Sequence, residues 1–461
     1  MKTLFNFSLI SIIFLSLNAC SVHTIDYQPK PVVKAGALFS ETADKQRVSE
    51  RPWWLGFNRP LLNELIADSL NANQTILQAR ARLRQARAVT EQTRSSLFPQ
   101  VTVEGDAGKT WQGTDPRRGT ANIGSALQWE LDIFNRTGAL AEADRLDAQA
   151  RLEDMNALRL TLSAEVADAY FGAVAAQRRL ILLEDQVRTD QELLDLLTLR
   201  LENGVGTNVE VLQQQSLVAE SRSLIPSTKG LLRIFENRLD VLLGQMPDGQ
   251  NRIYADETLD LADIMPAVGV PADLLVNRPD LRAVKSELIA ADAEIAAAIA
   301  DRLPRFNLSG SFSYTDTAAY SGPVTMILGN FIQPLIDWGQ RKAKIEENRA
   351  VYEERLALFA QLYLEAVEAV ENALTREHRQ REFIKRLEER SVLLKKTKDE
   401  AEALYTQGVD DYLSVLNALQ ELNDVERDLI DERLILINTR IALHRAVGGA
   451  ITERSETEKA N

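Results

Sequence analysis

The chain has 461 residues, of which 45% are hydrophobic and 26% are charged, so it is long and apolar enough to bury a sizeable core. Its formal net charge of −14 argues against nucleic acid as a partner, because basic groups are needed to neutralise phosphates. The single cysteine excludes a disulfide within the chain, and the three scattered histidines lack the ligand spacing of a structural zinc site. No glycine-rich phosphate loop or histidine-centred catalytic cluster occurs, so we expect no enzyme activity and no cofactor.

The N-terminus has the features of a cleaved signal peptide. Lys2 supplies a positive charge, and Leu4 to Leu17 form an apolar segment with the length and flanks of a secretory signal. The following Leu17-Asn18-Ala19-Cys20 resembles a bacterial lipobox, and Ser21 fits sorting to the outer membrane. We therefore predict that residues 1–19 are a lipoprotein signal peptide and that Cys20 carries the lipid. The alternative is an ordinary signal peptide followed by a coincidental cysteine.

The next segment is polar and irregular, and the folded body starts after it. Residues 20–53 predict a lipid-anchored tether, and the cluster Trp53-Trp54 marks the beginning of the folded part. Apolar residues at helical spacing predict one helix from Leu61 to Leu70 and a second from Gln74 to Leu97, which Phe98-Pro99 closes.

Two pairs of strands follow from a change to a two-residue period. Apolar and polar residues alternate around Val101 and Val103 and again from Ile123 to Leu131, on either side of the polar turn 112–116. Residues 305–314 alternate in the same way, and after the loop 316–323 residues 325–333 do so less cleanly. Strands of about ten residues with one apolar and one polar face suit a barrel wall with lipid outside and water inside. The alternative is a hairpin packed on a soluble core.

Two long segments without proline, Arg136 to Asn203 and Arg341 to Gln407, predict helical rods. At about 1.5 Å per residue each rod spans roughly 100 Å. The second rod carries a 3–4 apolar repeat, typical of helices packed side by side, which fades at Glu377 and Gln380. Returning helices are predicted over residues 209–243 and 413–447, and prolines mark residues 247–271 as a linker.

The chain is a tandem duplication. Pro99 and Pro304, like Asp132 and Asp337, are 205 residues apart, whereas Gly204 and Gly408, like Gly244 and Gly448, are 204 apart. A deletion within the rod region accounts for the shift. We predict a first repeat at 54–246, a second at 272–449 and a polar tail at 450–461, each repeat reading helix, hairpin, long helix and returning helix.

The strand count restricts how a membrane barrel could form. Four strands cannot close a barrel, for which about eight are the lower limit. An open sheet in lipid would leave its edge groups unpaired, which the hydrocarbon does not tolerate. We therefore expect the strands of several subunits to share one barrel and the rods to assemble into a helical tube, although this geometry does not fix the number of subunits.

Short motifs follow one another in a characteristic order between Trp54 and Gly449. They are Leu97-Phe98-Pro99, Asp132 to Arg136, Val205-Gly206-Thr207, Arg278-Pro279-Asp280, Ile336-Asp337-Trp338-Gly339 and Gly408-Val409. Their layout resembles the TolC-type outer membrane factors, and the lipobox is similar to the lipoprotein branch that serves resistance–nodulation–division efflux pumps. The resemblance implies a homotrimer with a mixed fold, a twelve-stranded outer-membrane β-barrel on a long α-helical periplasmic tunnel. It also implies a periplasmic adaptor and an inner-membrane pump as partners, in a Gram-negative bacterium.

Two groups of residues acquire functional interpretations from this resemblance. Gly204 and Gly206 fit turn positions that need a positive φ after a helix end. The resemblance implies that the two helix–helix tips contact the adaptor. The tip residues are Gly204, Val205, Gly206 and Thr207 in the first copy and Gly408, Val409 and Asp410 in the second. The alternative is a plain turn between helices, and Asp410-Asp411 in place of Gly206-Thr207 makes the two tips unequal.

The periplasmic end of the tunnel is the second such place, because family members narrow there. The gate candidates by position are Tyr405, Asp410, Asp411 and Leu413. Three chains would bring like carboxylates together around an axis, where their repulsion would influence opening. The alternative is that these aspartates are solvated residues favoured by the helix dipole. Asn417 stands where some relatives carry a carboxylate.

Three functions remain to be weighed. The resemblance favours a passive exit duct for small molecules such as drugs in a tripartite efflux pump. A duct of a type I protein secretion system is the alternative in the same class, although such exporters often lack the lipobox. A structural coiled-coil lipoprotein would explain the rods and the anchor but not the four amphipathic strands. Nothing in the sequence identifies the cargo.

Overall fold

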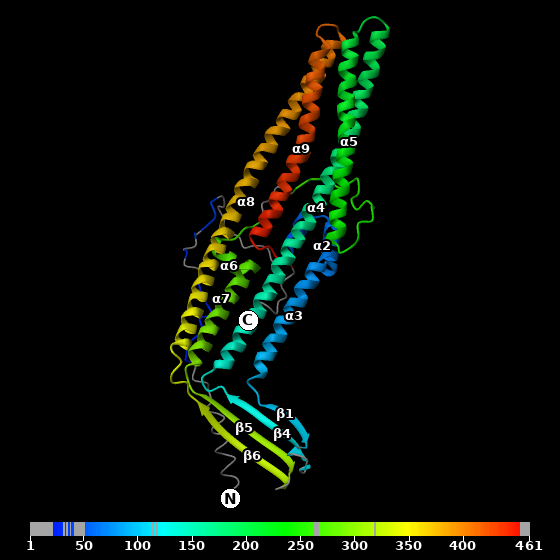
Figure 1. Ribbon diagram of the computed structural model, residues 1–461. Helices are drawn as coiled ribbons and strands as arrows, with labels where there is room; N and C mark the ends of the chain where they lie inside the picture. The colour runs from blue at the N-terminus through cyan, green and yellow to red at the C-terminus, as the bar shows by residue number, and fades with distance from the viewer. Residues whose placement is uncertain are drawn as a thin grey trace. The chain divides into compact units, whose positions relative to one another are not determined.

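The computed structural model describes residues 22–30, 33, 36, 38–40, 51–109, 111–112, 115–116, 119–261, 267–317 and 320–451 (Figure 1). The predicted signal peptide, the lipidation site Cys20 and residues 452–461 of the predicted tail lie outside the described residues. The chain divides into two units. Unit 1 consists of residues 1–34, 79–155 and 280–362, and unit 2 of residues 35–78, 156–279 and 363–461.

The elements follow the predicted order in both copies. The helices are η1 (Trp53–Phe57), α2 (Pro60–Ala72), α3 (Gln74–Ser95), α4 (Arg136–Glu202), α5 (Asn208–Leu242), η2 (Pro271–Asp273), α6 (Leu274–Asn277), α7 (Pro279–Ala300), α8 (Gln340–Thr406) and α9 (Tyr412–Ala446). The strands are β1 (Gln100–Gly108), β2 (Trp111–Gln112), β3 (Asp115–Pro116), β4 (Thr120–Leu131), β5 (Arg305–Asp316) and β6 (Ser321–Ile332). No helix among the described residues combines the length and the apolar character needed to cross a bilayer. The predicted rods and returning helices are confirmed to within two residues.

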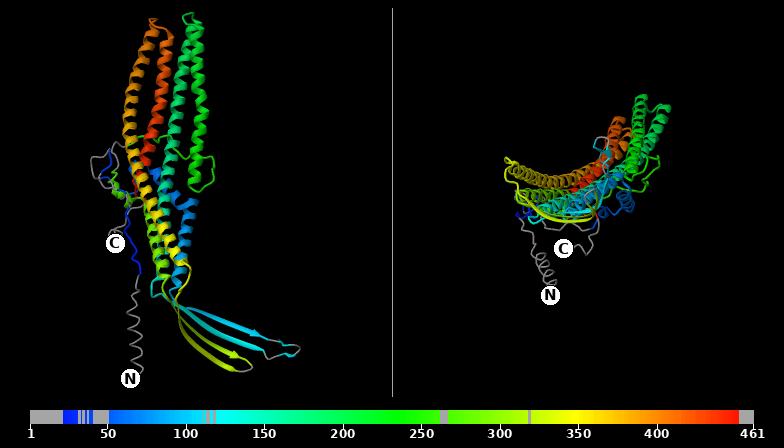
Figure 2. Two further views of the ribbon diagram at one scale, coloured as in Figure 1. Left: turned by 60° about the vertical axis from the view of Figure 1, so that its left-hand side comes forward. Right: turned by 60° about the horizontal axis from the view of Figure 1, so that its bottom comes forward.

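Unit 1 contains a four-stranded antiparallel sheet in the order β1-β4-β5-β6, and β2 pairs with β3 in a separate two-stranded sheet (Figures 1 and 2). The register of the four-stranded sheet aligns the apolar residues of β1, β4 and β5 on one face, because Val101 pairs with Leu127 and Leu127 with Gly310. In β6 apolar residues occur on both faces, since Ile327 pairs with Gly310 but Leu328 pairs with Ser309. The polar residues align on the other face, where Gln128 pairs with Ser309. The alternation read from single strands therefore continues across β1, β4 and β5 and is incomplete in β6, as the sequence predicts.

The apolar face of the sheet is exposed. Among its side chains, Val103 is 76% exposed, Ile327 79% and Phe331 67%. No helix in the described part of unit 1 covers these residues. An apolar sheet face of this size requires a partner that is itself apolar.

The second hairpin is tighter than the sequence predicts. Residues 316–323 were expected to form a loop, but β5 continues to Asp316 and β6 begins at Ser321. Pro323 lies within the ladder opposite Tyr314. Proline is tolerated there because β6 is an edge strand within this chain, where a missing N–H need not break a second ladder.

The described residues of the predicted tether are irregular, as expected, but they pack on the helices of unit 1. His23 Nε2 lies 2.6 Å from Asp292 Oδ1, and the backbone N–H of Asp26 donates to Asp292 Oδ2 at 2.8 Å. The hydroxyl of Tyr27 donates to Glu142 at 3.1 Å. Residues 22–30 are thus fixed to α7 and α4 and do not behave as a free tether.

Unit 2 has the largest apolar core, built around η1 and α2. Trp53, Trp54 and Phe57 pack with Ile66 of α2 and Tyr170 of α4. The indole N–H of Trp53 donates to Ser163 Oγ at 3.1 Å, and its ring stacks on His444 with 5.4 Å between centroids. Burial, together with the charge of Arg440, lowers the pKa of His444 to about 3, so this histidine is a neutral core residue.

The two copies end their returning helices in the same way. Asn73 Nδ2 donates to the carbonyl of Leu242 at 2.9 Å, and Arg278 Nη1 donates to the carbonyl of Ala446 at 3.0 Å. The donors are 205 residues apart and the acceptors 204, which matches the sequence offsets. Each bond satisfies one of the last carbonyls of a helix, which the helix itself leaves unpaired.

The deletion predicted within the rods is wrong. Both α4 and α8 contain 67 residues. The offset changes just before them, since Asp132 and Asp337 differ by 205 whereas the helix starts Arg136 and Gln340 differ by 204. One residue fewer therefore separates Asp337 from its helix than separates Asp132 from its own.

A buried ion pair explains why the apolar repeat of the second rod is interrupted. The Glu377 side chain on α8 is fully buried and Arg440 on α9 is 5% exposed. Arg440 Nε lies 2.8 Å from Glu377 Oε1 and 2.9 Å from Oε2. One turn on, Gln380 Nε2 donates to the carbonyl of Glu432 at 3.1 Å. The break in the pattern is thus a polar connection between α8 and α9.

We expect Glu377→Ala to lower the free energy of unfolding by about 3–5 kcal/mol, because it leaves a buried guanidinium without its carboxylate. The measurement is the denaturant or thermal midpoint of the purified protein in detergent. Glu388→Ala is the matched control on α8, since its pair with Arg433 is exposed, with side-chain exposures of 48% and 43%, and its loss should be about 0–1 kcal/mol. Equal shifts for the two variants would contradict this role.

Candidate functional site

Each pair of long helices in unit 2 is joined by a short turn with the same backbone hydrogen bonds. In the first turn the N–H of Val205 donates to the Arg200 carbonyl at 3.0 Å, and in the second that of Val409 donates to the Leu404 carbonyl at 3.0 Å. Gly204 has a φ of 72° and Gly408 a φ of 74°. Glycine is the residue that adopts this left-handed conformation without strain, so it ends both helices.

The prediction that Gly206 needs a positive φ is wrong. It is not among the described residues with positive φ. A Cβ at Gly206 would lie 3.1 Å from the backbone nitrogen of Leu201 and 3.2 Å from Arg200 Cβ. Glycine is therefore needed there for close approach of the turn to the end of α4.

The two turns differ in how they start the returning helix. Thr207 forms a capping box with Glu210, with bonds of 3.1 and 3.3 Å. Asp411 instead accepts from the N–H groups of Leu413 at 3.1 Å and Ser414 at 3.4 Å. Asp410 Oδ1 accepts from the Asp411 N–H at 2.8 Å. The predicted inequality of the two tips is thus an exchange of one kind of helix cap for another.

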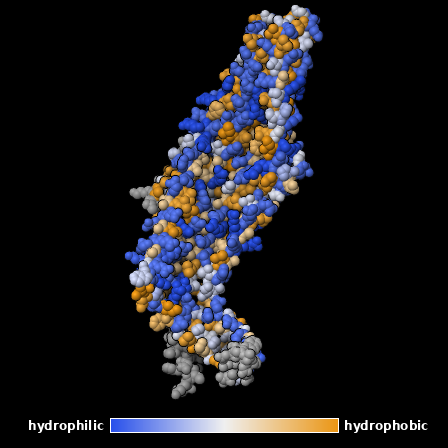
Figure 3. Space-filling model, in the orientation of Figure 1, coloured by the Kyte–Doolittle hydropathy of each residue, from blue (hydrophilic) through white to orange (hydrophobic). Residues whose placement is uncertain are grey.

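Apolar side chains are exposed at both turns. Val205 is 65% exposed, Val209 61% and Val409 70%, and Leu413 is 49% exposed. Figure 3 shows apolar residues lying among hydrophilic ones at the end of unit 2 that carries the turns. Both tips therefore present small apolar surfaces that capping does not require.

The gate candidate Tyr405 belongs to a network that connects the two helical hairpins. Its side chain is 7% exposed, and its hydroxyl donates to Glu210 at 3.2 Å. The guanidinium carbon of Arg200 lies 4.7 Å from the centre of its ring. Burial and the charge of Glu210 raise the pKa of the Tyr405 hydroxyl, so it stays protonated and remains a donor.

The network continues deeper between the helices. The hydroxyl of Tyr412, whose ring lies edge-on to Tyr405 at 5.6 Å, donates to Gln214. Gln214 in turn donates to the Asp190 carbonyl at 2.7 Å, and Ser221 Oγ donates to the Asp190 carboxylate at 3.1 Å. Sequence reasoning placed Tyr405 near the gate but missed these partners, for which the available signal was polar residues at otherwise apolar positions.

Asp410, Asp411 and Leu413 do not join the network. Asp410 and Asp411 are exposed at the second turn, as is Leu413 at the start of α9. All four predicted gate residues lie at one end of unit 2, but Tyr405 is buried there whereas the other three are exposed.

We expect Asp411→Ala to destabilise the fold by about 1 kcal/mol, because it removes the cap of α9, whereas Asp411→Asn should have little effect since asparagine caps equally well. Thermal unfolding of the purified variants measures the difference. If the asparagine variant were as unstable as the alanine variant, the charge of Asp411 and not its cap would account for its contribution.

Residues 65–245 and 270–449, nearly the two predicted repeats, each match the model of the family described as outer membrane efflux protein. The chain is 28% identical over 462 residues to the pyoverdine export outer membrane protein OpmQ of Pseudomonas putida, covering 96% of this chain and 97% of the relative. It is 26% identical over 454 residues to the cation efflux system protein CusC of Escherichia coli K12, covering 94% and 97%. The solved outer-membrane channel OprN superposes with a TM-score of 0.84 at 27% identity, covering 94% of this chain and all of that one.

Proposed function

Because the chain belongs to the outer membrane efflux protein family, we propose that it is the outer-membrane exit duct of a tripartite efflux pump. Three copies form the channel, which is embedded in the outer membrane of a Gram-negative bacterium and extends into the periplasm. A periplasmic adaptor and an inner-membrane pump of the resistance–nodulation–division type complete the assembly. The duct itself is passive, and the pump supplies the energy.

The register of the sheet is the observation that carries this proposal. In β1, β4 and β5 one face is apolar and the opposite face is polar, which suits lipid on one side and water on the other, and the edge strand β6 is apolar on both faces. In the described chain β1 and β6 each pair on one side only. Joining β6 of one copy to β1 of the next satisfies both edges and closes a barrel.

The tips are the part of the duct that we assign to the adaptor. Their exposed valines offer an apolar contact, and the different caps of the two turns let the adaptor distinguish them. Opening is a shift of the returning helices against α4 and α8, which requires the bonds of Tyr405 and Tyr412 to α5 to break. The exposed Asp410 and Asp411 contribute charge at the closed end.

The cargo is a small molecule whose identity the relatives do not settle. Their names refer to pyoverdine in one case and to cations in another. Ducts of one fold thus serve different pumps, and selectivity resides in the pump. Secretion of a protein through a type I system is the alternative function, and the experiment must distinguish it from efflux of small molecules.

We expect deletion of this chain to raise the intracellular accumulation of a fluorescent efflux dye, and restoration of the chain to reverse the change. Val409→Asp should fail to restore efflux because a charge at the tip opposes apolar docking, whereas the matched variant Val409→Ile should succeed. The measurement is dye fluorescence in cells with equal amounts of outer-membrane protein. Unchanged dye handling together with loss of a secreted protein from the medium would replace efflux by secretion.

For the gate, we expect Asp410→Asn combined with Asp411→Asn to reduce the cation preference of the channel in planar bilayers, since the asparagines keep the cap but remove a ring of negative charge. The single variant Asp411→Asn separates the contributions of the two positions. Unchanged conductance and unchanged cation preference in the double variant would exclude both residues from the gate.

A further inference from the structure

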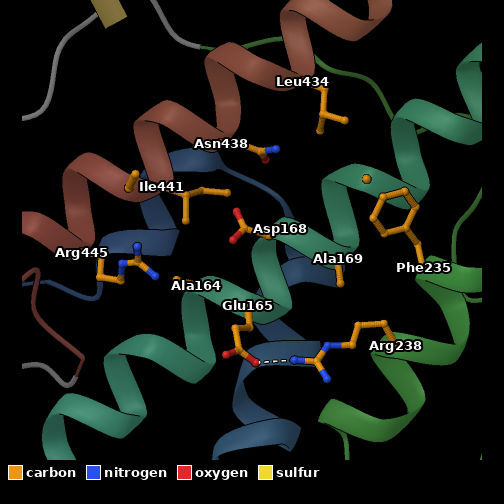
Figure 4. A pocket seen from close by; sticks show the side chains of 12 residues that line it. Ala164, Glu165, Asp168, Ala169, Phe235, Arg238, Leu434, Asn438, Ile441 and Arg445 are labelled. Atoms are coloured by element: carbon orange, nitrogen blue, oxygen red, sulfur yellow. Dashed lines mark hydrogen bonds and ion pairs between the residues drawn. The ribbon is translucent and has the colours of Figure 1, made fainter. Parts of the chain in front are cut away.

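Unit 2 contains a cavity of about 370 Å3 that neither the tips nor the sheet explains (Figure 4). Three helices line it: α4, α5 and α9. Figure 4 shows Asp168 of α4 at its centre, between Arg445 of α9 on one side and Phe235 of α5 on the other. A cavity of this size is within the range of sites for small organic molecules.

The cavity lies at the edge of the core of unit 2, because its lining residues Ala164, Ala169 and Ile441 also belong to that core. At 3.6 residues per turn, Glu165, Asp168 and Gly172 fall on one face of the helix. Val166 and Tyr170 fall on the opposite face and are buried against η1 and α2. Glu165 and Asp168 are therefore polar residues at the edge of the core, on the face of α4 opposite Val166 and Tyr170.

Charge in the cavity is only partly paired. Glu165 accepts from Arg238 at 2.7 Å, so these two groups satisfy one another. Within the described part of the chain, the Asp168 carboxylate has no hydrogen-bond donor. Asn438 Oδ1 is a buried acceptor that has no hydrogen-bond partner among the described residues. Two unused acceptors thus share one cavity.

The rest of the lining is apolar. Phe235, Leu434 and Ile441 form its walls, together with alanines of α4 and α9. The ring of Phe235 lies against Gly172, where an added Cβ would come within 2.4 Å of it. No group of three metal-ligating side chains occurs in the described residues. The lining therefore suits an organic ligand with an apolar body and a donor group better than a metal ion.

Titration of Asp168 agrees with this geometry. Burial raises the pKa of Asp168 to about 6, Glu165 on the same helix acts in the same direction, and Arg445 on α9 opposes both. Arg238 on α5 is held by Glu165. The cavity thus holds a carboxylate that is desolvated and that a bound cation would stabilise.

We propose that this cavity binds a small amphipathic ammonium ion, such as a protonated arylalkylamine. The N–H groups donate to the Asp168 carboxylate and the Asn438 carbonyl oxygen, and the apolar body packs against Phe235, Leu434 and Ile441. Arg445 also lines the cavity beside Asp168, but it is exposed, so solvent screens its charge. Binding as such does not depend on the proposed export function, whereas a role for the ligand as cargo rests on it.

The test uses the purified full-length protein and two probes of one shape, 2-phenylethylamine and 2-phenylethanol, measured by titration calorimetry. The wild type should bind the amine at least tenfold more tightly than the alcohol. Asp168→Asn should abolish that preference, and Asn438→Leu should weaken binding of the amine. Asp185→Asn is the matched control, because Asp185 lies on the same helix in an exposed pair with Arg188. This variant should bind the amine as tightly as the wild type does.

The affinity should also depend on pH in a defined direction. The ligand requires ionised Asp168, so protonation of the free cavity below pH 6 competes with binding. Affinity for the amine should fall about tenfold from pH 7 to pH 5, since each unit below the pKa reduces the ionised fraction tenfold. Asp168→Asn should show no such dependence.

A stability readout separates a binding residue from a structural one. The pKa of Asp168 is raised in the fold, so its ionised form weakens the fold above pH 6 and the weakening is relieved as the pH falls from 6 towards 4. Asp168→Asn should therefore raise the unfolding midpoint at pH 8 and raise it clearly less at pH 4.5. A variant that is more stable but no longer binds the amine is the outcome expected for a ligand site.

Three results would overturn the proposal: no binding of the amine to the wild type, equal binding of amine and alcohol, or undiminished binding by Asp168→Asn. In cells, Asp168→Asn should impair efflux of a cationic dye more than that of a neutral one. Equal efflux of both by the variant, with amine binding intact in the wild type, would mean that the cavity holds a resident ligand and not cargo. The deletion strain tests the proposed function separately, because loss of the whole chain should abolish efflux of both dyes.

Discussion

The unpaired edges of the four-stranded sheet constrain the rest of this molecule. In hydrocarbon every backbone N–H and C=O group needs a partner, and a sheet with free edges does not meet that requirement. Because β1 and β6 pair on one side only in the described chain, the strands require other copies to complete them. Each copy that joins the shared sheet also brings the long helices that continue from its strands. The oligomeric duct thus follows from a hydrogen-bonding demand of the strands.

The duplication gives both halves of the chain the same order of elements, but the two copies have diverged in particular places. Their returning helices end with equivalent hydrogen bonds from Asn73 and Arg278. Their tips differ, since Thr207 forms a capping box and Asp411 a simple cap. The buried pair of Glu377 and Arg440 is a further difference. It belongs to the second copy, and the equivalent positions of the first copy hold Ala173 and Glu236. The two hairpins therefore differ in chemistry both at their tips and in their packing.

Polar groups inside the helical layer are the second theme of the structure. The bonds of Tyr405 and Tyr412 to α5 join the two hairpins near the tips, and the cavity around Asp168 lies along α4, α5 and α9. Buried polar networks whose bonds are satisfied fix the geometry of a helix packing, because each bond requires a defined arrangement of its partners.

By itself the sequence determined the element order, the rods, the hairpins and the amphipathic strands, because periods of 3.6 and 2 and the placement of proline are local properties. The offset of 205 residues likewise reveals the duplication in the sequence alone. Only the tertiary structure decided the partners of Glu377, the network of Tyr405 and the close approach at Gly206, since each depends on residues distant in the chain or on backbone geometry. The cavity around Asp168 belongs to the same class. A single aspartate on a solvated helix has no signature, and its burial arises only when α5 and α9 pack beside it.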